Sequence, residues 1–102
     1  MKEVILDGRL LTTKNRFYEH LDESFEFPDH FGKNLDALWD VLNEEAEPFT
    51  IRFIYVTKFL EDMDGYGESV LRFFRKLDQK NEHVKVYYYL KDYIKEIEEQ
   101  EE

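Results

Sequence analysis

Four acidic residues recur at helical spacing in the stretch 36–47, and their type and spacing could support chemistry or binding. Asp36, Asp40, Glu44 and Glu47 follow one another at intervals of three or four residues. On a helix this spacing gathers like charges on one side, which costs roughly 0.2–0.5 kcal/mol per pair. Two uses would justify that cost: acid–base catalysis by paired carboxylates, or recognition of a cationic partner.

The catalytic use requires a concave pocket that raises the pKa of one carboxyl group. At about 100° per residue, the acidic residues fall on an arc that points away from the leucines of the same stretch. A pair formed by Asp36 and Asp40 would therefore lie on a convex, exposed surface, which disfavours a hydrolase. On spacing alone, a solvated acidic face remains a simple alternative. The arc consists of Asp36, Asp40, Asn43, Glu44 and Glu47.

Other reactive groups do not form a recognisable motif. GESVL around Ser69 lacks the second glycine of a nucleophile elbow. A calcium loop aligned on DMDGYGES would have leucines, which cannot bind calcium, at its first and twelfth positions. The three histidines are scattered along the chain, which predicts no metal site. His30 is worth retaining as a recognition side chain, because it lies just before the acidic stretch. The sequence thus predicts neither an enzyme nor a cofactor.

Composition favours a protein partner over nucleic acid. The chain has 102 residues and a formal net charge of −10, so we expect one domain with an acidic surface. Phosphate contacts need lysine and arginine, whereas a basic protein would be attracted to this surface. The absence of cysteine suits a reducing compartment. The start MKEVILDGRL is too short and charged for a signal peptide, and no apolar run approaches the roughly 20 residues of a membrane span. We therefore expect a cytoplasmic protein.

Three apolar segments predict strands, at 3–7, 49–56 and 84–90. Helices are predicted between them. The first is capped by Thr13 or Asn15 and runs to about Ser24. The second opens at Gly32 and Asn34 and closes at Pro48, with its core stripe formed by Leu35, Leu38, Trp39 and Leu42.

The segment 63–69 (MDGYGES) is predicted to be a loop, followed by a helix that buries Val70, Phe73, Phe74 and Leu77. Strands that alternate with helices predict an α/β fold with a parallel sheet and right-handed crossovers. The apolar spacing of Tyr93, Ile94 and Ile97 predicts an extra C-terminal helix from Lys91 to about Gln100. We expect residues 1–90 to form the domain and residues 91–102 to be a helical extension of it.

The stretch 27–42, FPDHFGKNLDALWDVL, resembles the signature of the barstar family, whose prototype is the intracellular inhibitor of the ribonuclease barnase. The similarity extends from about Glu3 through GESVLRFFR to Leu90. It implies a three-stranded parallel sheet flanked by helices. It also implies that the chain is monomeric when free and inhibits a basic secreted ribonuclease of the barnase type, or a related nuclease or toxin. The alternative is a barstar-like interaction or regulatory module that inhibits no ribonuclease.

The resemblance also implies roles for individual residues. In that family the position of Asp40 enters the nuclease active site, where substrate phosphate would lie, and Asp36 matches a neighbouring interface aspartate. Gly32 and Asn34 match the loop that meets the enzyme, and His30 replaces a contacting tyrosine. The implied partner-binding set is His30, Gly32, Asn34, Leu35, Asp36, Trp39, Asp40, Asn43, Glu44 and Glu47.

This chain departs from the family pattern at the edge of that surface. Glu45 replaces an interface tryptophan, and Lys76 and Lys80 replace two acidic residues. Together with Arg72, these lysines form a basic stripe at positions i, i+4 and i+8. The simple explanation is a solvated helix face, whose charge the glutamates of the C-terminal tail could neutralise.

Overall fold

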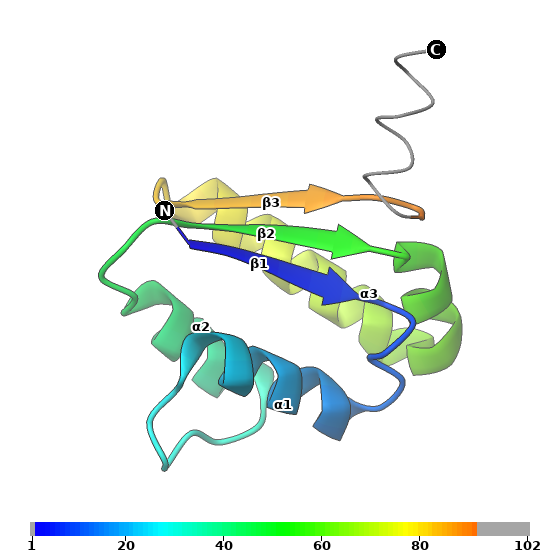
Figure 1. Ribbon diagram of the computed structural model, residues 1–102, viewed down its shortest axis with the longest axis horizontal. Coiled ribbons are helices and arrows are strands. Elements are labelled where there is room, and N and C mark those ends of the chain that lie inside the picture. The colour runs from blue at the N-terminus through cyan, green and yellow to red at the C-terminus, as the bar shows by residue number, and fades with distance from the viewer. Residues whose placement is uncertain (1, 92–102) are drawn as a thin grey trace.

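Three parallel strands form one sheet, as the sequence predicts, and their order in the sheet is β1-β2-β3. The structure is a computed structural model and describes residues 2–91. Two helices connect β1 to β2, and one long helix connects β2 to β3 (Figure 1). The elements are β1 (Lys2–Asp7), α1 (Lys14–Phe25), α2 (Leu35–Asn43), β2 (Phe49–Ile54), α3 (Val56–Lys80) and β3 (Val84–Tyr88).

The helices cover one face of the sheet, where the hydrophobic core lies (Figure 1). Strand side chains alternate between faces, so Val4, Ile51 and Val86 lie in one row and are all buried. The next row, formed by Ile5, Arg52 and Tyr87, lies on the other face. There Ile5 is 38% exposed and Tyr87 is 45% exposed. The helices must therefore be arranged side by side on a single face.

Helix α1 begins where the sequence predicts. The Thr13 hydroxyl oxygen accepts a hydrogen bond from the Arg16 backbone N–H at 3.1 Å, which satisfies one of the free donors of the first turn. The helix ends at Glu26, which adopts a left-handed conformation with φ of 55°. Its apolar side chains, Phe17, Tyr18, Leu21 and Phe25, are all buried.

The prediction of a loop at 63–69 is wrong. Helix α3 starts at Val56 and continues through this segment, with one non-helical residue at Asp64 (φ 49°, ψ −140°) that marks a kink. Gly67 is needed for close packing rather than for a turn. A Cβ atom there would lie 3.2 Å from Leu60 Cδ2 and 3.3 Å from Met63 Cβ. Glycine thus lets the two arms of the kinked helix approach each other.

Three predicted element ends also need correction. Strand β2 stops at Ile54 because Tyr55 has φ of 53°, a left-handed conformation that leaves the strand and precedes α3. Strand β3 stops at Tyr88, two residues early. Helix α2 ends at Asn43 and not near Pro48, and the Glu44 N–H makes its closing hydrogen bond to the Asp40 carbonyl oxygen at 3.1 Å.

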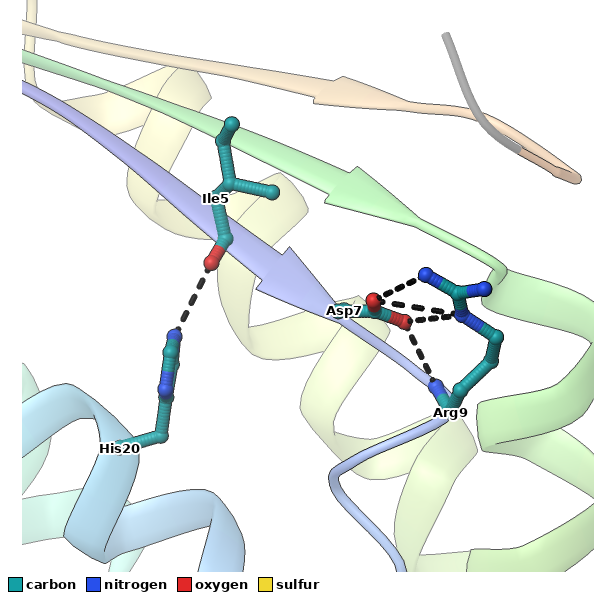
Figure 2. A network of polar contacts seen from close by, with 4 residues as sticks. All are labelled: Ile5, Asp7, Arg9 and His20. Atoms are coloured by element: carbon teal, nitrogen blue, oxygen red, sulfur yellow. Dashed lines mark hydrogen bonds and ion pairs between the residues drawn. The ribbon is translucent and has the colours of Figure 1, made fainter.

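Side chains form hydrogen bonds with backbone groups of both edge strands of the sheet. On β1, His20 of α1 donates from Nε2 to the Ile5 carbonyl oxygen at 3.0 Å (Figure 2). On β3, the Val86 N–H donates to Asp78 Oδ2 at 3.1 Å. At the end of β1 the Arg9 guanidinium binds the Asp7 carboxylate, with Nη2 2.7 Å from Oδ2. These hydrogen bonds hold the pKa of Asp7 below its usual value.

The predicted C-terminal helix, apart from Lys91, lies outside the described residues. Within residues 2–91, no helix combines the length and the apolar character that crossing a membrane would require.

Candidate protein-binding surface

The loop that precedes α2 is fixed by aromatic packing. Phe27 stacks on Phe25 of α1 with ring centroids 5.6 Å apart, and Phe31 lies 4.7 Å from Phe27. The Phe31 N–H donates to the Pro28 carbonyl oxygen at 2.9 Å, which closes a turn. His30 lies in this turn and is exposed. The loop therefore exposes His30, while its neighbours Phe27 and Phe31 pack against the hydrophobic core.

Asn34 joins the loop to α2. Its side-chain Oδ1 accepts a hydrogen bond from the Ala37 N–H at 2.8 Å, and its backbone N–H donates to the Gly32 carbonyl oxygen at 2.8 Å. The first contact is an N-cap, made by one of the two residues at which the sequence predicts the helix to open. Asp36 lies in the first turn of α2, where the helix dipole favours negative charge.

Leu38 and Leu42 anchor α2 in the core, while the rest of its predicted apolar stripe stays near the surface. Leu35 and Trp39 are only partly buried. The Trp39 ring meets Phe73 of α3 edge to face, with centroids 5.7 Å apart. The two buried leucines therefore attach α2 to the core, and both sides of the helix remain accessible.

A hollow of about 220 Å³ lies between the loop and α2, and we call it the loop hollow. Four residues predicted to bind a partner line it: His30, Gly32, Asp40 and Glu44. Its remaining lining is mostly apolar and comes from Pro28, Phe31, Ala37 and Val41. The structure thus combines two exposed carboxylates with an apolar floor.

A second hollow, of about 270 Å³, lies on the other flank of α2, and we call it the helix hollow. Three further predicted residues line it: Leu35, Asp36 and Trp39. Phe73 and Lys76 of α3 complete it. Asp36 and Asp40 therefore open onto different hollows. This separation does not form the shared pocket that a two-carboxylate catalytic site requires.

The remaining three predicted residues line neither hollow. Asn34 serves as the N-cap. Asn43 is used inside the chain, because its Nδ2 donates to the Trp39 carbonyl oxygen at 2.8 Å and its Oδ1 accepts from Asn81 Nδ2 at 2.9 Å. Glu47 is exposed and follows the end of α2, so it does not continue the acidic arc of the helix.

Sequence reasoning left six lining residues out of the predicted set. Ala37 and Val41 could have been found, because they lie within one helical turn of Asp40. Phe73 could not, since only the packing of α3 against α2 brings it to the helix hollow. The resemblance points to Lys76, but only as a departure from the family pattern. The other two, Pro28 and Phe31, belong to the loop.

A metal-dependent use of the acidic residues has no support in the described part of the chain. Within residues 2–91, no three His, Asp or Glu side chains are grouped closely enough to hold a metal ion. What the arrangement can do chemically is to present carboxylates to a cationic surface.

Two comparisons with known proteins agree on the family. The model of the family described as Barstar (barnase inhibitor) matches residues 1–91, which include the loop and both hollows. A protein of Bacillus subtilis (strain 168) named "Putative ribonuclease inhibitor YrdF" is 31% identical over 84 residues, which cover 78% of this chain and 89% of the relative. The acidic loop-and-helix surface, the parallel sheet and these matches lead to one conclusion: the chain belongs to the barstar family.

Proposed function

We propose that this protein inhibits a basic bacterial ribonuclease by covering its active site with the loop 28–34 and α2. One observation carries the proposal. Asp40 and Glu44 flank an apolar hollow, and the helix that carries them is anchored in the core, so both carboxylates are exposed on a fixed backbone. Such a surface can replace the phosphates of RNA in a cationic site. The family and its relative support an inhibitor of this general type.

The charge distribution suits this target. Residues 26–47 contain seven acidic residues and one lysine. A ribonuclease binds its substrate through lysine and arginine, and complementary potentials accelerate the encounter of two proteins and fix their orientation. The acidic face would therefore steer the chain toward the same groups that bind RNA.

We assign the central contact to Asp40, because it lies on the exposed side of α2 beside the loop. Asp36 would meet a neighbouring cation, and Leu35 and Trp39 would supply apolar contacts from the helix hollow. His30, Gly32 and Asn34 would form the loop part of the interface. Asn43, Glu44 and Glu47 would lie toward its rim. Inhibition would follow from exclusion of RNA and needs no catalytic group.

We place this activity in the cytoplasm, since the chain has no cysteine and needs no oxidising compartment. The target would be a secreted ribonuclease of the barnase type or a related nuclease, bound by one copy of the chain.

The proposal is tested by comparing two single carboxylate removals. The parent is first screened for inhibition against a panel of small basic bacterial ribonucleases. Asp40→Ala and Glu47→Ala are then titrated calorimetrically against a ribonuclease that the parent inhibits. Asp40→Ala should weaken binding by about 2–5 kcal/mol or more, a range taken from buried charge pairs in protein interfaces, barnase with barstar among them. Glu47→Ala should mainly slow association and reduce its salt dependence.

Circular dichroism controls for folding, and both variants should retain the parent spectrum because neither side chain is buried. Equal, small losses for the two variants would contradict the proposed role of Asp40. Failure of the parent to inhibit any ribonuclease in a broad panel would favour an interaction module of the same family that does not inhibit nucleases.

A further inference from the structure

The surface changes sign where α2 meets α3. Residues 70–80 contain four basic residues and one acidic residue, in contrast to the acidic stretch 26–47. Three of the basic residues lie at positions i, i+4 and i+8 on one side of α3, and all are exposed. We call them the basic stripe: Arg72, Lys76 and Lys80.

Two contacts join α2 to the end of α3. Trp39 meets Phe73 with ring centroids 5.7 Å apart, and Asn43 at the end of α2 accepts a hydrogen bond from Asn81 Nδ2 at 2.9 Å. The second half of α2 therefore lies along the end of α3, the segment that carries the basic stripe.

Lys76 is the member of the stripe that enters the candidate surface. Its Nζ lies 5.9 Å from the centroid of the Trp39 ring, at the outer limit of a cation–π contact. It lines the helix hollow together with Asp36. Among residues 2–91, no carboxylate lies within 4 Å of Lys76 Nζ. One hollow therefore offers an ammonium group and a carboxylate that are not paired with each other, over an aromatic floor.

We infer that Lys76 determines which ribonucleases the protein binds. Its ammonium group would need a carboxylate on the partner, next to the partner's cations that bind Asp36 and Asp40. The inference rests on the proposed function and narrows the partner to ribonucleases whose basic active site is bordered by an acidic side chain. A nuclease that is basic throughout this border would face the basic stripe, and like charges across an interface are repulsive. The acidic helix provides attraction, and Lys76 excludes wrong partners.

The test reverses one charge at a time in the full chain. Lys76→Glu is compared with Lys85→Glu, which makes the same change at an exposed lysine of β3, away from both hollows. The probe is a small basic ribonuclease that the parent inhibits. Lys76→Glu should raise the Kd by roughly 10- to 100-fold, and this loss should shrink at high salt, while Lys85→Glu should change the Kd by less than about threefold.

Asp40→Ala, measured in parallel, separates this inference from the proposed function. If Asp40→Ala weakens binding but Lys76→Glu leaves it unchanged or tightens it, the inference is wrong and the inhibitor function stands. If neither change affects binding, the ribonuclease is bound through another surface, and both the proposed binding role of the loop and α2 and the inference fail. A loss of thermal stability in Lys76→Glu with unchanged binding would assign the lysine to a contact within the chain and would also overturn the inference.

Discussion

Helices α1 and α2 are neighbours on the same face of the sheet, yet they use their apolar residues differently. Helix α1 has four large apolar side chains among twelve residues, and all four are buried. Helix α2 has six apolar residues among nine, but only Leu38 and Leu42 are buried. The helix with the more apolar sequence is therefore the more exposed one. Apolar surface that folding leaves uncovered next to carboxylates is what a protein–protein interface needs.

The largest difference between the two helices should appear when one aromatic side chain is removed from each. Phe17→Ala should lower the free energy of unfolding by about 3–5 kcal/mol, because Phe17 is fully buried. Trp39→Ala should cost about half as much, since part of the indole is already exposed. Urea denaturation followed by circular dichroism measures both. Equal losses would show that α2 is as much a core helix as α1.

The N-caps offer a matched test of smaller size. Thr13→Ala and Asn34→Ala should each cost about 1 kcal/mol of stability, because each removes the side-chain acceptor of a first-turn N–H. Only Asn34→Ala should also weaken ribonuclease binding, because Asn34 sets the start of the helix that carries Asp36 and Asp40. A binding loss of the same size in both variants would remove the distinction between a structural helix and a binding helix.

The helix ends give the smallest expected effect. Glu26 closes α1 in a left-handed conformation, which glycine adopts more easily, so Glu26→Gly should stabilise the protein by about 0.5–1 kcal/mol. Glu44 closes α2 in a right-handed conformation with φ of −87°, so Glu44→Gly should bring no such gain. The shift of the urea denaturation midpoint measures the change in stability caused by each substitution. Stabilisation by both substitutions would refute the conformational argument.

The two helices also show how far sequence reasoning reached. Sequence reasoning placed α1 and offered Thr13, with Asn15 as the alternative, as its cap, because a capping hydrogen bond depends only on neighbouring residues. The same reasoning assigned Leu35 and Trp39 to the core stripe of α2. The structure leaves them partly exposed, since their burial depends on how far α3 extends over them.

The errors arose where distant residues decide the backbone. Gly65 and Gly67 indicated a loop, but Gly67 serves the packing of one arm of α3 against Leu60 and Met63. Sequence spacing cannot distinguish a glycine that permits a turn from one that permits close approach. For the candidate surface, seven of the ten predicted residues line the two hollows, and those that complete the helix hollow come from α3.

The hydrogen bonds at the two edges of the sheet have a consequence for how this protein can be stored. Unpaired edge strands are templates for pairing with another chain, and natural proteins block them. Here His20 occupies a carbonyl oxygen of β1, and Asp78 occupies an N–H of β3. The proposed inhibitor would bind its target one to one, so it would have to accumulate to at least the concentration of that target. Each of these side chains occupies one backbone group that another chain would need for pairing, so His20 and Asp78 would help to keep a concentrated inhibitor from assembling into fibrils.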